Sequence, residues 1–182
     1  YNIKTFHYIY TFLRIITIIK EGGGMKLLSI LLILFSIKTY AARSLENYNL
    51  GAGQVGLIHH VSQQAYDPVS VFPEGGSSAL PGKNEISTVF KGVTYLFANM
   101  ANKNLFEADP GKYEPTYGGW CARAMIVGQK VGIDPELFTI NGNRAHYFVN
   151  SRAKRFFDRD VVGNEAKADQ AWKELTGEDP RL

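Results

Sequence analysis

The sequence has little cysteine and little proline, and it lacks the short motifs of common enzyme classes. A single cysteine among 182 residues excludes a disulfide framework within the chain. With 18 glycines and 7 prolines there is no collagen-like repeat, and 45% apolar with 13% aromatic residues excludes wholesale disorder. No internal repeat or low-complexity tract is visible. No H-E-x-x-H, G-x-S-x-G, P-loop or C-x-x-C motif occurs, so nothing in the sequence predicts an enzyme.

The first 24 residues are rich in Ile, Tyr, Thr, Phe, Lys and Asn, and they end directly before Met25. Back-translated, Lys20-Glu21-Gly22 permits AAGGAGG, a ribosome-binding sequence. We therefore expect residues 1–24 to be translated upstream DNA and exclude them from fold reasoning. A basic amphipathic leader is the alternative.

Residues 25–41 have the pattern of a signal peptide. Lys26 supplies the positive charge, residues 27–35 form a short apolar run, and small residues lead to a cleavage site after Ala41. The run is too short to span a bilayer comfortably, which needs about 20 residues, although a retained anchor is the alternative. We expect an exported protein, periplasmic or secreted, with no membrane attachment after signal cleavage.

The net charge of +3 comes from this N-terminal region. Residues 1–41 contain five of the 20 basic residues and one of the 17 acidic residues. The remainder therefore has 15 basic and 16 acidic residues. A remainder with a net charge of −1 gives no electrostatic case for nucleic-acid binding.

Residues 42–65 are polar, contain three glycines and show no sustained period, so we expect a flexible N-terminal arm before a domain over residues 66–177. Two pairs of β-rich runs around tight turns predict hairpins at residues 86–97 and 137–149. Helices are expected over residues 99–108, 119–130, 151–158 and 163–175. The predicted fold is α+β, a small antiparallel sheet of two hairpins packed with about four helices. The residues expected to share its core are Phe90, Tyr95, Phe97, Phe106, Tyr147 and Phe148.

Three stretches carry a resemblance to a known family: Asp67-Pro68-Val69, Gly92-Val93-Thr94-Tyr95-Leu96-Phe97 and residues 106–113. They resemble the YHS domain, whose pattern runs D-P-V-C-G, then G-x-x-Y-x-F-C-S-x-x-C, then F-x-x-D-P-x-x-Y. The chain is also similar to a longer exported variety with the motif P-x-Y-G-G-[YW]-C-A, here residues 115–122. That variety adds a G-K-L-Y-L-N-like strand, here residues 141–150, and a tryptophan near the C-terminus, here Trp172.

The resemblance implies a binding domain, with copper as the first candidate metal. Metal-binding members, including modules attached to copper-transporting ATPases, use thiolates, which suit Cu(I) or zinc. The three family cysteines fall on Ser70, Ala98 and Asn102, so the usual thiolate cluster is absent here.

Cys121 is the first candidate for other chemistry, because it follows Gly118-Gly119 at an expected helix start. Free backbone N–H groups and the helix dipole would stabilise a thiolate there. The alternative is a small buried residue that packs the helix against the sheet. Metal binding, redox chemistry and packing all remain open for this residue.

Imidazoles of His146, His59 and His60 could join Cys121 in a copper or zinc site. The alternatives are a solvated His59-His60 pair and a half-buried His146 with a satisfied nitrogen. The loop Tyr117-Gly118-Gly119-Trp120 is a candidate ligand-binding segment, because backbone amides before a helix can hold an anion. Its alternative is a tight turn under the tryptophan. The basic residues between 152 and 159, which have acidic neighbours, are expected to be a solvated face.

The expected function is that of an exported, non-catalytic YHS-like domain that binds a metal ion, copper first, or a small ligand. A thiol-dependent redox protein using Cys121 is one alternative. A non-catalytic structural or partner-binding module is the other.

Overall fold

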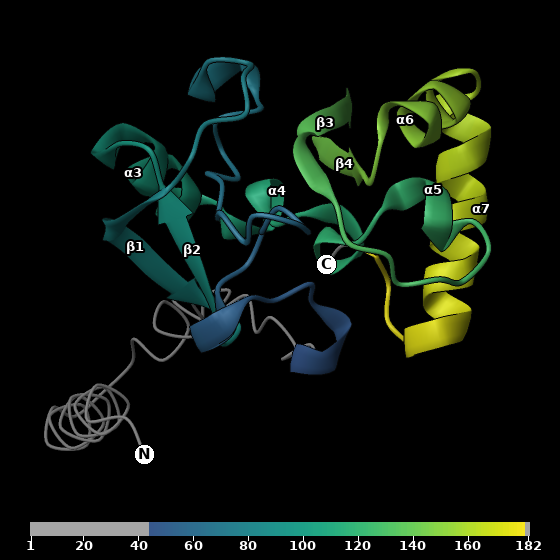
Figure 1. The fold of residues 1–182 in the computed structure, drawn as a ribbon, viewed down its shortest axis with the longest axis horizontal. Helices are drawn as coiled ribbons and strands as arrows, with labels where there is room; N and C mark the ends of the chain where they lie inside the picture. The colour runs from purple at the N-terminus through teal and green to yellow at the C-terminus, as the bar shows by residue number, and fades with distance from the viewer. Residues whose placement is uncertain (1–43, 181–182) are drawn as a thin grey trace, which may run out of the picture. The chain divides into compact units, whose positions relative to one another are not determined.

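A computed structural model describes residues 44–180 of the chain, so the expected upstream region and signal peptide lie outside the described residues. The described part is an α+β domain of two antiparallel hairpins and five α-helices, which confirms the predicted fold class (Figure 1). In chain order its strands and α-helices are β1 (Lys83–Phe90), β2 (Val93–Phe97), α3 (Met100–Ala108), α4 (Pro110–Tyr113), α5 (Ala122–Met125), β3 (Asp134–Asn141), β4 (Arg144–Phe148), α6 (Ser151–Asp158) and α7 (Val161–Thr176). Short 3-10 turns are η1 (Leu45–Asn47), η2 (Ala52–Gln54), η3 (Pro73–Gly75) and η4 (Thr116–Gly119). Within residues 44–180, no helix has the length and apolar character to cross a membrane.

The two hairpins form two separate two-stranded sheets, rather than one sheet as expected. Lys91 and Gly92 connect β1 to β2 with φ values of 51° and 85°. Positive φ at both central residues gives a turn whose twist matches that of the strands. Asn99 then caps α3, because its side chain accepts a hydrogen bond from the Asn102 N–H. Figure 1 shows β1, β2 and α3 on one side of the domain, and β3, β4 and α5 to α7 on the other.

The structure contains an internal repeat that the sequence analysis does not detect. Both hairpins have the same register and the same irregularity, and Asp134 of β3 follows Lys83 of β1 by 51 positions. Each hairpin leads into a helix capped by an asparagine, Asn99 before α3 and Asn150 before α6. We call residues 83–108 the first hairpin–helix unit and residues 134–159 the second.

Side-chain contacts repeat at the same spacing. The ring centroids of Phe97 and Phe106 lie 5.3 Å apart in the first unit, and those of Phe148 and Phe157 lie 5.3 Å apart in the second. Matching hydrogen bonds and ion pairs join Thr88 to Glu107 and Thr139 to Asp158, and Lys103 to Glu107 and Lys154 to Asp158. Most other positions differ between the units, which is why the repeat is visible in the backbone register and not in the sequence.

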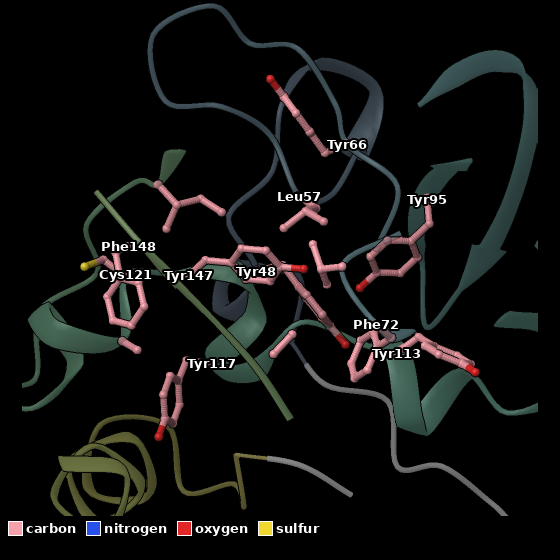
Figure 2. Close-up of a cluster of buried hydrophobic side chains, with 14 of the residues drawn as sticks. Tyr48, Leu57, Tyr66, Phe72, Tyr95, Tyr113, Tyr117, Cys121, Tyr147 and Phe148 are labelled. Atoms are coloured by element: carbon pink, nitrogen blue, oxygen red, sulfur yellow. The ribbon is translucent and has the colours of Figure 1, made fainter. Parts of the chain in front are cut away.

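One hydrophobic core joins both units to the helices (Figure 2). Of the six residues expected in it, five are buried and Phe90 is partly buried against them. Met100, the first residue of α3, is 54% exposed. Its position in the first turn of α3 points it away from Phe106, which is fully buried on the same helix.

Residues 44–65, the described part of the segment expected to be a flexible arm, pack against the domain. Tyr48 and Leu57 are 4% and 1% exposed, and both belong to the core. The segment also bonds the first hairpin, through the Gly56 N–H to Thr94 O at 3.0 Å, and the residue before β3, through the His60 N–H to Ile133 O at 2.7 Å. It uses isolated bridges and 3-10 turns, which have neither helical nor strand periodicity. We call residues 44–65 the N-terminal strap.

The helix expected over residues 119–130 is much shorter, because α5 covers only Ala122–Met125. Gly119 has φ of 83° and Trp120 is extended, so the helix cannot begin at either residue. Gly128, with φ of 67°, prevents its continuation.

Candidate functional site

Cys121 lies in the core and has no exposed surface (Figure 2). Its backbone N–H donates to Val131 O at 2.9 Å, and its thiol is free. The residue sits directly before α5, whose four residues form a single turn. This environment matches the packing alternative for Cys121, since reactive cysteines are at least partly accessible.

His146 is on β4, fully buried, and its Nε2 lies 2.5 Å from Glu165 Oε2. Burial lowers the pKa of His146, and the hydrogen bond to Glu165 offsets this only in part. The imidazole is therefore neutral and donates its Nε2–H to the carboxylate. Its Nδ1 has no hydrogen-bond partner within residues 44–180.

Glu165 belongs to a polar network that fastens α7 to the second hairpin. Arg144 on β4 pairs with Glu165 at 3.0 Å and forms two hydrogen bonds to Asp169, at 2.9 and 2.7 Å. The Tyr117 hydroxyl donates to Asp169 at 2.7 Å, and Figure 2 shows the hydroxyl directed toward the yellow helix. We call these residues, with Asn141, the α7 clamp. Its donors and acceptors largely satisfy one another, which is the pattern of a structural network rather than of a catalytic site.

The clamp shifts the pKa of Glu165, and the pKa of Tyr117 is shifted as well. Burial alone would raise the pKa of Glu165, but hydrogen bonds from His146 and Asn141 and the charge of Arg144 lower it to about 2. Burial raises the pKa of Tyr117 far above its usual range, and the bond to Asp169 adds to this. Sequence reasoning missed the clamp. The available signal was the spacing of two acids four residues apart on an expected helix, opposite two basic residues at alternate positions of a strand.

His59 and His60 lie in a local turn at the surface, where His60 is exposed and His59 is partly buried. Their rings stack at 5.0 Å, and His59 Nδ1 accepts the N–H groups of Val61 and Ser62 at 3.1 and 3.2 Å. His60 Nδ1 lies 2.8 Å from Ile133 O, so it donates to that carbonyl. Both Nδ1 atoms are thus engaged in holding the strap in place.

No metal centre is formed by the candidate ligands in the part of the chain described. Across residues 44–180, no three His, Cys, Asp or Glu side chains lie together in a group that could hold a metal ion. Cys121 and His146 sit on different elements, each inside the core, whereas His59 and His60 are in the strap.

The segment Tyr117-Gly118-Gly119-Trp120 docks the strap and does not face solvent. Gly118 has φ of 62°, and a Cβ there would lie 2.2 Å from Asn47 O. The N–H and side chain of Asn49 donate to Gly118 O and Gly119 O at 2.9 and 3.1 Å, and the Trp120 indole donates to Asn47 O at 3.1 Å. These contacts favour the tight-turn alternative over an anion-binding loop.

The buried carboxylate of Asp67 accepts hydrogen bonds from all three residues at the positions that the resemblance assigns to cysteine. Asp67 Oδ1 accepts the N–H groups of Val69 and Ser70 at 2.8 and 3.3 Å. Its Oδ2 accepts the Ala98 N–H at 2.9 Å and the Asn102 side-chain amide at 2.6 Å. Asp67 is fully buried, and we call these five residues the Asp67 cluster.

A hollow of about 690 Å³ lies along α6. Four arginines line it, three from α6 and its C-terminal end and one from α5, together with Asn150 and Phe156. The arginines are Arg123, Arg152, Arg155 and Arg159. We call this hollow the arginine groove; sequence reasoning treated its α6 residues as a solvated face.

Comparison with protein-family models, curated proteins and solved structures finds no match to this chain. Function is therefore inferred from the Asp67 cluster, the buried thiol and the arginine groove.

Proposed function

We propose that the chain is an exported, non-catalytic binding domain built on the YHS plan, which acts without thiolate or soft-metal chemistry. The observation that carries the proposal is the Asp67 cluster. Ser70, Ala98 and Asn102 are the positions at which the family motifs have cysteine, and all three bond to one carboxylate. Their convergence supports the resemblance, because unrelated positions 28 and 32 residues from Ser70 would have no reason to meet.

The same cluster argues against a metal at that place. Four N–H donors point at the two oxygens of Asp67, so the lone pairs that a cation would need are already occupied. Donors of this kind stabilise an anion and repel a cation. With no thiol at any of the three positions, the cluster lacks the ligands that select Cu(I).

The burial of the Cys121 thiol argues against the redox alternative. A redox cysteine must reach its substrate as a thiolate, whereas Cys121 has no exposed surface. A copper site made by Cys121 with His146, His59 or His60 is the remaining alternative, and it requires side chains on separate elements to come together. Export rests on the signal-peptide pattern of residues 25–41.

Restoring the thiolates tests the proposal. The variant Ser70→Cys, Ala98→Cys, Asn102→Cys should bind one Cu(I) or Zn²⁺ per chain in an anaerobic competition with a chelating dye, while the wild type binds neither. A matched control carries three cysteines at the exposed, scattered positions Ser62, Ser78 and Ser151, and should bind much more weakly.

Two outcomes would contradict the proposal. Stoichiometric Cu(I) binding by the wild type, lost in Cys121→Ala, would establish the copper alternative. Equal binding by the restored and scattered variants would mean that the three positions do not form a family site.

A further inference from the structure

The arginine groove has no acidic counterpart in the described chain. None of its four arginines has a carboxylate within ion-pair distance among residues 44–180. The acids nearest in sequence are otherwise engaged: Asp158 pairs with Lys154, and Asp160 caps α7 through the Gly163 N–H. Four like charges around one hollow repel each other, and a bound anion would relieve that repulsion.

The arrangement of the groove is suited to several anionic groups at once. Arg152, Arg155 and Arg159 follow helical spacing, and Arg159 keeps helical backbone angles at the end of α6. At about 1.5 Å per residue they span roughly 10 Å, which exceeds the width of one phosphate group. Arg123 reaches the same hollow from α5 and lies over the Phe156 ring at 4.1 Å, which orients its guanidinium.

The internal repeat shows that the fold does not require these charges. In the first hairpin–helix unit, the positions matching Arg152, Arg155 and Arg159 are Ala101, Asn104 and Ala108, by the same shift of 51 residues. All six residues are exposed. The same hairpin–helix unit is thus built with neutral residues on α3 and with three arginines on α6.

We propose that the arginine groove binds a small ligand carrying several phosphate groups. This inference rests on the proposed function, because it gives the non-catalytic binding domain a binding site. Guanidinium groups recognise phosphate oxygens in pairs, and all four cations are arginine. The hollow has the volume of a small-molecule site, and its concave shape fits a compact oligophosphate better than a bilayer surface.

Calorimetric titration of the full chain with tripolyphosphate tests the inference, with inorganic phosphate and sulfate as single-anion comparisons. Tripolyphosphate should bind at least about tenfold more tightly than either, because it contacts several arginines together, and its affinity should fall as salt rises. Transplanting the first unit's residues, as Arg152→Ala, Arg155→Asn, Arg159→Ala, should weaken binding roughly a hundredfold. The thermal midpoint should stay unchanged, since these side chains are exposed.

The control is Lys83→Ala, Lys103→Ala, Lys167→Asn, which removes the same charge from other places and should weaken binding no more than a few-fold. Equal loss in the two variants would overturn the inference, as would equal affinity for tripolyphosphate and single anions. Binding to vesicles rich in anionic lipid without binding to tripolyphosphate would replace it with a membrane-facing surface. The phosphate titrations and the Cu(I) titration are independent experiments. The proposal of phosphate binding in the arginine groove can therefore fail while the proposal of a metal-free YHS-like domain stands, and the reverse.

Discussion

Among single residues, Cys121 has a site that differs from that of a reactive thiol. Its sulfur lies in the core with aromatic side chains, and it is fully buried. A small apolar residue can occupy that space, whereas a hydroxyl there would lose its hydrogen bonds to water.

We therefore expect two outcomes for Cys121. The native thiol should react with an aromatic disulfide reagent far more slowly than the unfolded thiol, because it is exposed only on opening. Cys121→Ser should cost more stability than Cys121→Ala, by about 1–3 kcal/mol for an unsatisfied buried hydroxyl. Rapid labelling of the folded chain, or a serine variant as stable as the alanine variant, would show that the site is open to solvent.

Alanine variants of Gly118 and Gly142 distinguish two causes of lost stability, steric overlap with a neighbour and an unfavourable backbone conformation. Both have positive φ, 62° and 58°, so an alanine at either is strained by about 1 kcal/mol. At Gly142 the added Cβ meets nothing within 4 Å, whereas at Gly118 it would lie 2.2 Å from Asn47 O. Gly118→Ala should therefore lose several times more stability than Gly142→Ala in denaturant unfolding. Similar losses in the two variants would mean that the strap does not dock on Gly118.

At the scale of elements, α7 is held to the second hairpin by charge as well as by its buried Trp172. The folded pKa of Glu165 is about 2, below its ordinary 4.5. The ionised carboxylate therefore contributes its full share to the free energy of unfolding above about pH 5. This contribution is lost as the pH falls through 4.5 toward 2. His146 acts in the same direction from about pH 6.5 downward, because burial lowers its pKa and the unfolded chain takes up the proton more readily. Arg144, Asp169 and Asn141 face the same pair.

Glu165→Gln should accordingly destabilise the domain by roughly 2–3 kcal/mol near neutral pH, and much less near pH 3, where the wild-type carboxylate begins to be protonated. Thermal midpoints measured by circular dichroism between about pH 7 and pH 3 provide the test. Glu174→Gln, on the exposed face of the same helix, is the control and should change stability by less than about 0.5 kcal/mol at any pH. A Glu165→Gln deficit that stays constant over this range would exclude an electrostatic clamp.

Elements with strong local signals were predictable from the sequence. Both hairpins have alternating β-rich runs around a turn, and α3 and α6 each begin at a capping asparagine. The strap and the short α5 were not predictable from the sequence, because isolated bridges and left-handed residues such as Leu57 produce no periodic pattern.

The candidate site was predictable only where motifs named its positions. Ser70, Ala98 and Asn102 could be picked from the family pattern, but their common partner Asp67 required the fold. The arginine groove was not predictable because Asp158 and Asp160 lie beside its arginines in the sequence, which suggests a balanced, solvated face. In the structure both acids are held by other groups.

At the scale of the whole molecule, the strap connects two hairpin–helix units that do not share a sheet. It bonds β2 through Thr94 and the residue before β3 through Ile133, and it places Leu57 in the common core. The two units are joined otherwise by core packing and by the segment between α3 and β3. Removal of the strap would thus expose core side chains of both units and leave backbone groups of Thr94 and Ile133 without partners.

A chain that begins at residue 66, where the sequence alone places the start of the domain, should therefore fail to fold cooperatively, whereas one that begins at residue 44 should unfold in a single transition. The strap buries Tyr48, Leu57 and Ile58, each at most 4% exposed. Burial of a large apolar side chain contributes about 1.5–3 kcal/mol, so three of them approach the roughly 5–15 kcal/mol that stabilises a small domain. Leu57→Ala in the full chain is a milder version and should cost about 2–5 kcal/mol. If the chain from residue 66 keeps the thermal midpoint of the chain from residue 44, the two units hold together without the strap, and its contacts are peripheral to the fold.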